Sequence, residues 1–183
     1  MGRKLDKILV VDVESTCWMG QPPIGQVNEI IEVGISAINI EDLKILGKKS
    51  YIVKPSLSKI SKFCTELTGL TQEIVEKGEN FKDVCNKIKT VYGTESRIWT
   101  SFGEYDKNQF KKCCDLFNIK SPFSDMHWNV KSMASIFYGW PEMGMDKLLN
   151  KLGMKLEGRH HCGADDAYNI AKILVDILGK GRK

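Results

Sequence analysis

The chain has 183 residues, of which 42% are hydrophobic and 27% are charged, which is typical of a globular domain and excludes a low-complexity chain. Lysine and arginine outnumber aspartate and glutamate by 27 to 23, and this excess is too small to identify a nucleic-acid partner by itself. No apolar run reaches membrane-spanning length, and the charged start lacks the apolar core of a signal peptide. We therefore expect one domain over residues 1–183, in a cytoplasmic protein whose six cysteines are reduced.

The first third of the chain has the pattern of three strands. The run that starts at Lys7 is apolar and β-branched, which is typical of a central strand covered on both faces. After a loop rich in glycine and proline, residues 30–40 alternate with the period of a strand, and residues 43–53 form a third candidate. Because the connection between the last two is short, a hairpin is favoured, and the sequence predicts an antiparallel meander.

The rest of the chain alternates between helical and strand patterns. A short helical turn near residues 64–68 is stopped by Gly69. The elements that follow are a helix over 81–91, a strand over 98–103, a helix over 105–117, a short strand near 127–130, helices over 130–138 and 145–152, and a last helix over 164–178 that ends before Gly179. A meander followed by alternating strands and helices indicates an α/β fold with a mixed sheet flanked by helices.

Two carboxylates end the first strand. Asp12 and Glu14 are two residues apart, so their side chains point to the same face. Removing two carboxylates from water is costly unless a positive group meets them, and the local sequence offers no lysine or arginine. A divalent cation held by oxygen ligands is the partner that this pattern favours.

A third carboxylate lies on the apolar side of a predicted helix. Asp106 falls in the first turn of the helix over 105–117, in line with Phe110, Cys113 and Phe117. The helix dipole favours an aspartate at this end, but it does not explain why the aspartate shares the buried face. The spacing therefore marks Asp106 as an inward-facing functional residue.

The last helix repeats this arrangement. Asp166 aligns with the apolar stripe of Ile170, Ile173 and Ile177, whereas Asp165 aligns with polar residues and is expected to be exposed. His161 precedes Asp166 by five residues across a loop that contains Gly163. His160 is the competing candidate, and the sequence does not decide between the two histidines.

Three separate segments thus supply four candidate metal ligands, which are Asp12, Glu14, Asp106 and Asp166. An all-oxygen donor set favours Mg²⁺ or Mn²⁺ over zinc. Four carboxylates can hold two such ions, and two ions can stabilise the attacking and leaving oxygens of phosphodiester cleavage. A neutral histidine near pH 7 is then a suitable general base for the attacking water.

Three motifs give the chain a resemblance to a known family. They are Asp12-Val13-Glu14, Ser101-Phe102-Gly103-Glu104-Tyr105-Asp106 and His161-Cys162-Gly163-Ala164-Asp165-Asp166. In this order they resemble the DEDDh family of 3′→5′ exonucleases, which have the ribonuclease-H-like fold. The segments Ser15-Thr16-Cys17-Trp18, Asn28-Glu29-Ile30-Ile31-Glu32 and Leu67-Thr68-Gly69-Leu70-Thr71 are most similar to the Eri-type exoribonucleases.

The resemblance implies a single exonuclease domain with a mixed five-stranded sheet, in which three antiparallel strands are followed by parallel ones. It implies that two divalent cations, Mg²⁺ or Mn²⁺, act with His161 as the general base, and that 5′-mononucleotides are released from 3′ ends. The expected partner is single-stranded nucleic acid, with RNA preferred over DNA. No interaction with a membrane is expected. An exonuclease that prefers DNA or short oligonucleotides, and a binding module without catalysis, are the alternatives.

By the same resemblance, six residues would bind the terminal nucleotide: Ser15, Thr16, Cys17, Trp18, Leu67 and Thr68. Trp18 would offer a surface on which a base stacks, although a core or lid aromatic is an equal alternative. Ser15 stands where the Eri-type branch often has alanine, and Phe102 where it often has tryptophan. Both differences bear on the substrate rather than on catalysis.

Overall fold

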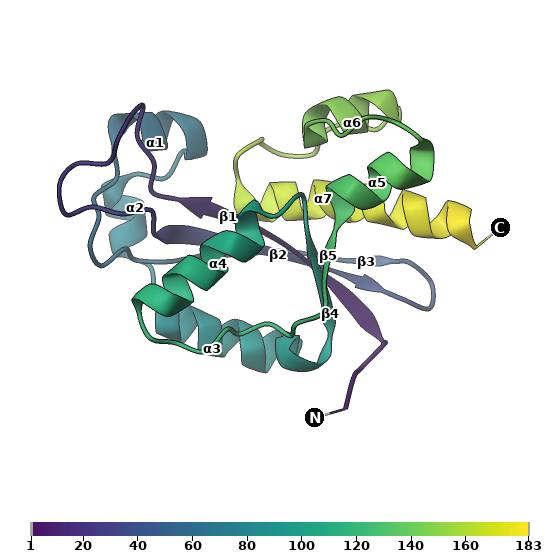
Figure 1. The fold of residues 1–183 in the computed structure, drawn as a ribbon, viewed down its shortest axis with the longest axis horizontal. Coiled ribbons are helices and arrows are strands. Elements are labelled where there is room, and N and C mark those ends of the chain that lie inside the picture. The colour runs from purple at the N-terminus through teal and green to yellow at the C-terminus, as the bar shows by residue number, and fades with distance from the viewer. Residues whose placement is uncertain (1, 183) are drawn as a thin grey trace.

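The computed structural model describes residues 2–182, which form one five-stranded sheet flanked by helices (Figure 1). The strand order is β3-β2-β1-β4-β5. The strands are β1 Lys7–Ser15, β2 Ile30–Asn39, β3 Ile45–Ile52, β4 Ile98–Ser101 and β5 His127–Asn129. The first three pair in antiparallel fashion, and β4 and β5 join in parallel. The predicted mixed sheet is therefore confirmed.

Seven α-helices and one 3₁₀ helix are found among the described residues. They are α1 Lys62–Thr68, α2 Gln72–Glu76, α3 Phe81–Tyr92, η1 Thr94–Ser96, α4 Tyr105–Leu116, α5 Val130–Tyr138, α6 Met145–Lys151 and α7 Gly163–Gly181. One face of the sheet packs against α3 and α4, and the opposite face packs against α5, α6 and α7. None of the described helices combines the length and the hydropathy that a bilayer span requires.

The central strand β1 is buried on both faces, as its continuous apolar run predicts. Leu9 and Val11 belong to the core beneath α3 and α4, whereas Ile8 and Val10 belong to the core beneath α7. Because side chains alternate along a strand, residues 12 and 14 continue the side of Ile8 and Val10. The two carboxylates at the end of β1 therefore project toward α7.

The last helix is longer than its sequence pattern indicates. The expected end before Gly179 is wrong, because α7 continues to Gly181. Its last turn is held by the Asp176–Lys180 ion pair, and the Arg182 guanidinium donates hydrogen bonds to the carbonyls of Ile40 and Glu41. These contacts offset the cost of a glycine inside the helix, which is about 1 kcal/mol.

Candidate active site

Carboxylates from three elements meet in one cavity of about 390 Å³. Asp12 and Glu14 come from the end of β1, and Asp166 comes from the first turn of α7. One oxygen of each lies within 4.8 Å of an oxygen of the other two. Asp106, in the first turn of α4, lines the same cavity. The structure thus brings together all four carboxylates that the sequence singles out.

Asp106 is held by the backbone of the strand that carries two of its neighbours. Its side chain is buried, and its Oδ1 accepts a hydrogen bond from the Val13 N–H at 2.9 Å. Val13 lies between Asp12 and Glu14, so this one bond joins the start of α4 to the end of β1. The fourth carboxylate is therefore fixed relative to the first two without help from a flexible loop.

Asp166 is positioned by a close approach of two glycines. In the β1–β2 register Gly34 stands opposite Asp12, and α7 begins directly against it at Gly163. A Cβ on Gly34 would lie 1.9 Å from the carbonyl carbon of Gly163, so no other residue fits this contact. The Gly163 N–H also donates to Glu32 Oε2 at 3.1 Å, which anchors the helix start on β2.

The cavity is strongly acidic, and this shifts the ionisation of its members. Burial, reinforced by Glu32 and Asp166, raises the pKa of Glu14 to about 8. Burial and the neighbouring carboxylates raise the pKa of Asp12, and burial raises that of Asp106 to about 6. Divalent cations fit such a site, because they replace the bound protons and remove the repulsion between the carboxylates.

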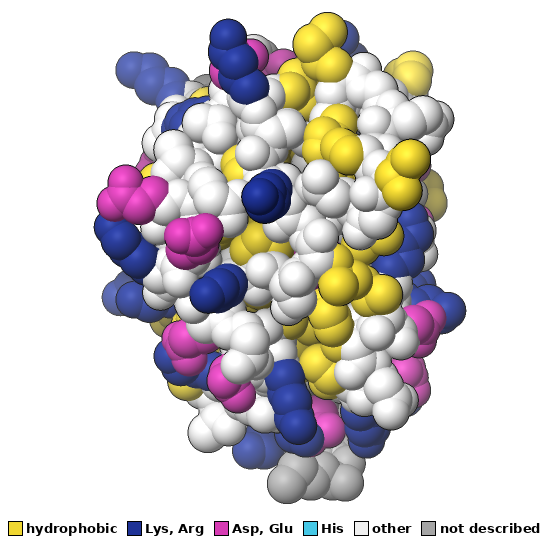
Figure 2. All heavy atoms as spheres, turned by 90° about the vertical axis from the view of Figure 1, so that its left-hand side faces the viewer, with side chains coloured by type: hydrophobic (Ala, Val, Ile, Leu, Met, Phe, Trp, Pro, Cys, Tyr) yellow, Lys and Arg dark blue, Asp and Glu magenta, His cyan; other side chains and the backbone are white. Residues whose placement is uncertain are grey.

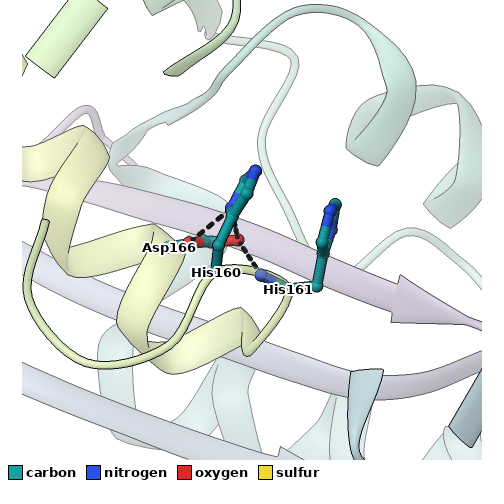
Figure 3. Close-up of side chains that lie close together, drawn as sticks. All are labelled: His160, His161 and Asp166. Atoms are coloured by element: carbon teal, nitrogen blue, oxygen red, sulfur yellow. Dashed lines mark hydrogen bonds and ion pairs between the residues drawn. The ribbon is translucent and has the colours of Figure 1, made fainter. Parts of the chain in front are cut away.

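The two histidine rings lie side by side, with His160 next to the Asp166 carboxylate and His161 on the far side of His160 (Figure 3). Their rings stack at a centroid distance of 4.0 Å. His160 Nδ1 lies 3.0 Å from Asp166 Oδ2, whereas His161 reaches the same oxygen through its backbone N–H at 2.9 Å. Among residues 2–182, no hydrogen bond to the His161 ring is found. Burial and the nearby His160 lower the pKa of His161, which keeps its imidazole neutral and able to accept a proton.

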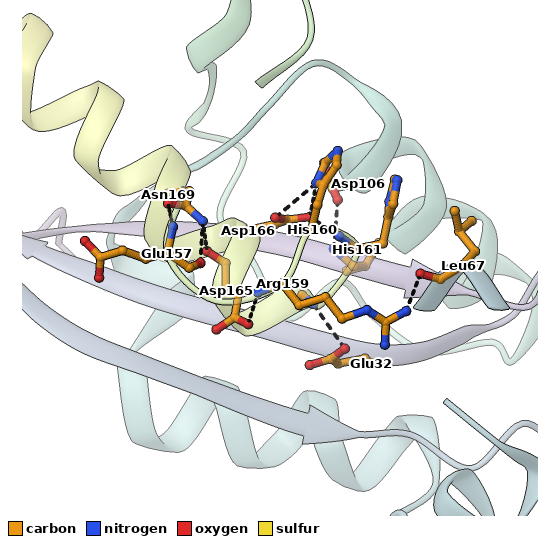
Figure 4. A network of polar contacts seen from close by, with 12 residues as sticks. Glu32, Leu67, Asp106, Glu157, Arg159, His160, His161, Asp165, Asp166 and Asn169 are labelled. Atoms are coloured by element: carbon orange, nitrogen blue, oxygen red, sulfur yellow. Dashed lines mark hydrogen bonds and ion pairs between the residues drawn. The ribbon is translucent and has the colours of Figure 1, made fainter. Parts of the chain in front are cut away.

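The loop that carries both histidines is held by side chains of α7 (Figure 4). Asn169 is fully buried, accepts a hydrogen bond from the Glu157 N–H and donates one to the Glu157 carbonyl. Asp165 accepts one from the Arg159 N–H at 2.8 Å and pairs with Lys48. The expectation that Asp165 is an ordinary exposed residue is wrong, because its side chain is only 17% exposed and stabilises this loop.

The Arg159 side chain fixes the same loop to a different wall of the cavity. Its guanidinium donates a hydrogen bond to the Leu67 carbonyl at 2.8 Å, at the end of α1 (Figure 4). Leu67 itself lines the cavity. Sequence reasoning missed Arg159 and Glu32 because their contacts join distant segments, and it missed Asn169 because the chain before α7 folds back over it. The only local signal is their proximity to the motifs.

The six residues expected to bind a nucleotide divide into two groups. Ser15, Cys17 and Leu67 line the cavity, and the buried Ser15 Oγ finds no hydrogen-bond partner within residues 2–182. The hydroxyls of Thr16 and Thr68 instead bond to nearby backbone groups, and Trp18 is half-buried and is not part of the cavity lining. Lining residues that the sequence did not single out as binding residues are Phe102, Tyr105, Met145 and Asp146.

The residues after Cys17 lead onto an apolar face of the molecule. Figure 2 shows this face, which carries the loop after β1 together with α1 and α2, and hydrophobic side chains gather on it between lysines and arginines. Exposed hydrophobic residues of these segments and of the loop before α1 are Met19, Ile24, Val27, Leu57 and Ile74. One wall of the cavity is thus continued along the chain by an apolar surface.

A mixed sheet of this topology, with an acidic cavity at the end of its central strand and histidines beside it, defines a ribonuclease-H-like domain with a candidate metal centre. Residues 9–174 match the exonuclease family (RNase_T). The chain therefore belongs to this exonuclease family, and within it to the DEDDh nucleases. The structure of the nuclease domain of 3′hExo, a DEDDh family member bound to rAMP, is 32% identical and superposes with a TM-score of 0.89, covering 99% of this chain and 96% of that domain.

Curated proteins with similar sequences are also named as 3′-5′ exonucleases. Human 3′-5′ exoribonuclease 1 is 34% identical over 96% of this chain, and the match covers 53% of the human protein. The 3′-5′ exonuclease Snipper of Drosophila melanogaster is 26% identical over 95% of this chain and 70% of its own length. The chain thus spans about half the length of the human relative.

Proposed function

We propose that residues 1–183 act as a single metal-dependent 3′→5′ exoribonuclease domain. The observation that carries this proposal is the convergence of Asp12, Glu14, Asp106 and Asp166 in one cavity beside a neutral histidine. The relatives support the direction and the substrate, because they are named as 3′-5′ exoribonucleases and one related nuclease domain binds rAMP.

The four carboxylates would hold two divalent cations, Mg²⁺ or Mn²⁺, since their donor atoms are all oxygens. When bound, these cations would supply positive charge at the attacking and leaving oxygens of phosphodiester hydrolysis. A ring nitrogen of His161 would accept the proton of the attacking water. The scissile bond joins the terminal phosphorus to the 3′ oxygen of the preceding nucleotide, so the product is a 5′-mononucleotide.

The terminal nucleotide would lie against the wall formed by Ser15, Cys17 and Leu67. The cavity volume of about 390 Å³ falls in the range of small-molecule sites, which suits one nucleotide rather than a duplex. The Ser15 hydroxyl, which has no hydrogen-bond partner in the described part of the chain, would offer a hydrogen bond to it. Thr16 and Thr68 would act indirectly, by keeping the backbone of this wall in place. Trp18 does not line the cavity and would contact nucleotides that lie outside it.

A degradation assay with a matched pair of variants tests this function. The purified chain is incubated with 5′-labelled single-stranded RNA or DNA in Mg²⁺, Mn²⁺ or EDTA. We expect progressive shortening from the 3′ end, faster on RNA and abolished by EDTA. Asp106→Asn should remove this activity, whereas Asp115→Asn, on the exposed face of the same helix, should leave it intact.

Three other outcomes are informative. Faster shortening of DNA would reverse the proposed preference. Stable complexes without shortening would instead support a binding module, and full activity of Asp106→Asn would refute the assignment of the metal ligands.

A cytoplasmic location with reduced thiols is part of the same proposal, and the free state of all six cysteines supports it.

A further inference from the structure

We propose that His160 is a metal ligand that adds a nitrogen donor beside Asp166, so that this site binds Zn²⁺ or Co²⁺ more tightly than four carboxylates alone would. The inference rests on the proposed metal centre and deepens it. Sequence reasoning treated His160 only as a competitor for the role of general base. The structure gives it a different position. Its side chain is directed at Asp166, one member of the carboxylate cage that is formed by Asp12, Glu14, Asp106 and Asp166 (Figure 3).

The distances between donor atoms fit a shared cation. His160 Nδ1 lies 3.0 Å from one oxygen of Asp166 and 3.3 Å from the other. Neighbouring ligands of a six-coordinate ion with bonds of about 2.1 Å are about 3.0 Å apart. Ligands of a tetrahedral ion with bonds of about 2.0 Å are about 3.3 Å apart. Nδ1 now shares a hydrogen bond with Asp166, so both atoms could bind one ion once that proton is lost and the His160 ring turns about its side-chain bonds, with the backbone of the loop in place.

The stacking of the two rings assigns this role to His160 alone. His160, His161 and Asp166 offer donor atoms within 4.8 Å of one another. However, the two imidazole planes are only 21° apart and their centroids are 4.0 Å apart, so their lone pairs lie in nearly parallel planes. An ion in the plane of His160 lies outside the plane of His161. His161 is thereby left free to accept a proton.

The backbone on both sides of His160 is already fixed. The Arg159 N–H donates to Asp165 at 2.8 Å, and the His161 N–H donates to Asp166 at 2.9 Å. The His160 side chain is 41% exposed, so an ion can reach it from solvent. A ligand held between two such anchors loses little freedom on binding, which strengthens a metal site.

The chemistry of the donor determines which ions benefit. Imidazole nitrogen is a good ligand for zinc and for cobalt, whereas Mg²⁺ prefers oxygen ligands and retains water. The gain from His160 should therefore be large for Zn²⁺ and Co²⁺ and negligible for Mg²⁺. Zn²⁺ held by His160 next to His161 should also slow hydrolysis that is supported by Mg²⁺.

Calorimetric titration of the full chain with Zn²⁺ alone, and separately with Mg²⁺ alone, tests this assignment. His160→Phe keeps a ring to stack on His161 and removes both nitrogens, and His161→Phe is the matched control. We expect His160→Phe to weaken Zn²⁺ binding by about tenfold or more and to change Mg²⁺ binding less than about twofold. His161→Phe should leave both affinities nearly unchanged. His160→Ala, checked for folding by circular dichroism, should repeat the result without the ring.

The visible absorption of bound Co²⁺ provides a second readout, because it changes when a nitrogen ligand is lost. An unchanged Zn²⁺ affinity in His160→Phe, an equal loss for Mg²⁺, or a loss in His161→Phe instead would each overturn the proposal. Binding is measured without nucleic acid, so these outcomes do not depend on nuclease activity. An inactive chain that loses Zn²⁺ binding in His160→Phe would refute the exonuclease and keep this inference.

Discussion

The two halves of the candidate site are built in different ways. Asp12 and Glu14 stand at the end of a central strand that is buried on both faces and hydrogen-bonded on both sides. His160 and His161 stand on a loop that is fixed mainly by the side chains of Asn169, Asp165 and Arg159. The strand half is held by the fold itself, whereas the loop half depends on a few polar contacts. Substitutions should therefore affect the two halves differently.

The largest effect is expected in the strand half. Asp12→Asn keeps the size of the side chain and removes one charge from the cage. We expect RNA hydrolysis to fall by at least about a thousandfold, because a metal site contributes several kcal/mol of charge stabilisation. The melting temperature of the metal-free protein should not fall, since one repulsive charge is removed. Rates on labelled RNA and thermal denaturation check both points, and retained hydrolysis would contradict the two-metal assignment.

A comparably severe effect is expected where the halves meet. Gly34→Ala places a methyl group 1.9 Å from the Gly163 backbone, so α7 must move away from β2 and carry Asp166 with it. Overpacking of this kind costs about 1–3 kcal/mol, and more where backbone is displaced. Urea denaturation should show this loss, and the rate of hydrolysis should fall. Gly20→Ala is the control, because no atom of the described residues lies within 4 Å of its added methyl. Equal stability of the two variants would show that the contact between Gly34 and Gly163 does not determine the position of α7.

A smaller effect is expected in the loop half. Asn169→Ala removes the bonds that fix Glu157, and the loop should then hold His161 less firmly. Groups that orient catalytic or metal-binding residues typically contribute about 10–100-fold. We expect a loss of this size in kcat with little change in KM, because the proposed nucleotide wall is untouched. Asn86→Ala, on the exposed side of α3, is the control. A change confined to KM would show that the loop binds substrate and does not position the general base, His161.

The contrast between the halves also explains what the sequence could predict. Asp12, Glu14, Asp106 and Asp166 were found because a carboxylate on an apolar strand or helix face breaks a local period. Glu32 was not found, because its proximity to Glu14 depends on the register of β1 and β2, and its contact with Gly163 joins segments that are far apart in the sequence. Local patterns thus identify side chains that regular elements position, and they miss those whose partners are set by tertiary structure.

The loop residues show the same limit. Asn169 and Asp165 fall on the polar stripe of α7, which amphipathic periodicity assigns to solvent. The chain before the helix folds back over that stripe, so Asn169 is fully buried. The periodicity of a helix carries no information about a loop that later covers its polar side. The hairpin, the mixed sheet and most element boundaries, in contrast, follow from alternation, glycine stops and caps, and the structure confirms them.

A still smaller effect is expected for the bond between the loop and α1. Arg159→Ala removes the contact with the Leu67 carbonyl, which is solvent-exposed and therefore contributes modestly. We expect KM for RNA to rise about three- to tenfold, a change equivalent to about 1 kcal/mol, because Leu67 belongs to the proposed nucleotide wall. Arg182→Ala is a matched control, since Arg182 also donates to backbone carbonyls but at the far end of α7. If both variants raised KM equally, the effect would be one of general stability.

The last effect is a pH dependence that follows from the charge of the strand half. Burial raises the pKa of Glu14 from 4.5 to about 8. The folded protein then keeps a proton that the unfolded chain has already lost, so its stability falls as the pH rises from 4.5 to about 8. Cation binding removes this penalty. We expect Mn²⁺ to raise the melting temperature more at pH 8 than at pH 5, by roughly 2–4 °C for each kcal/mol of difference. Glu14→Gln should flatten the pH dependence of the metal-free protein, and an equal Mn²⁺ shift at both pH values would mean that the strand carboxylates are ionised before the cation arrives.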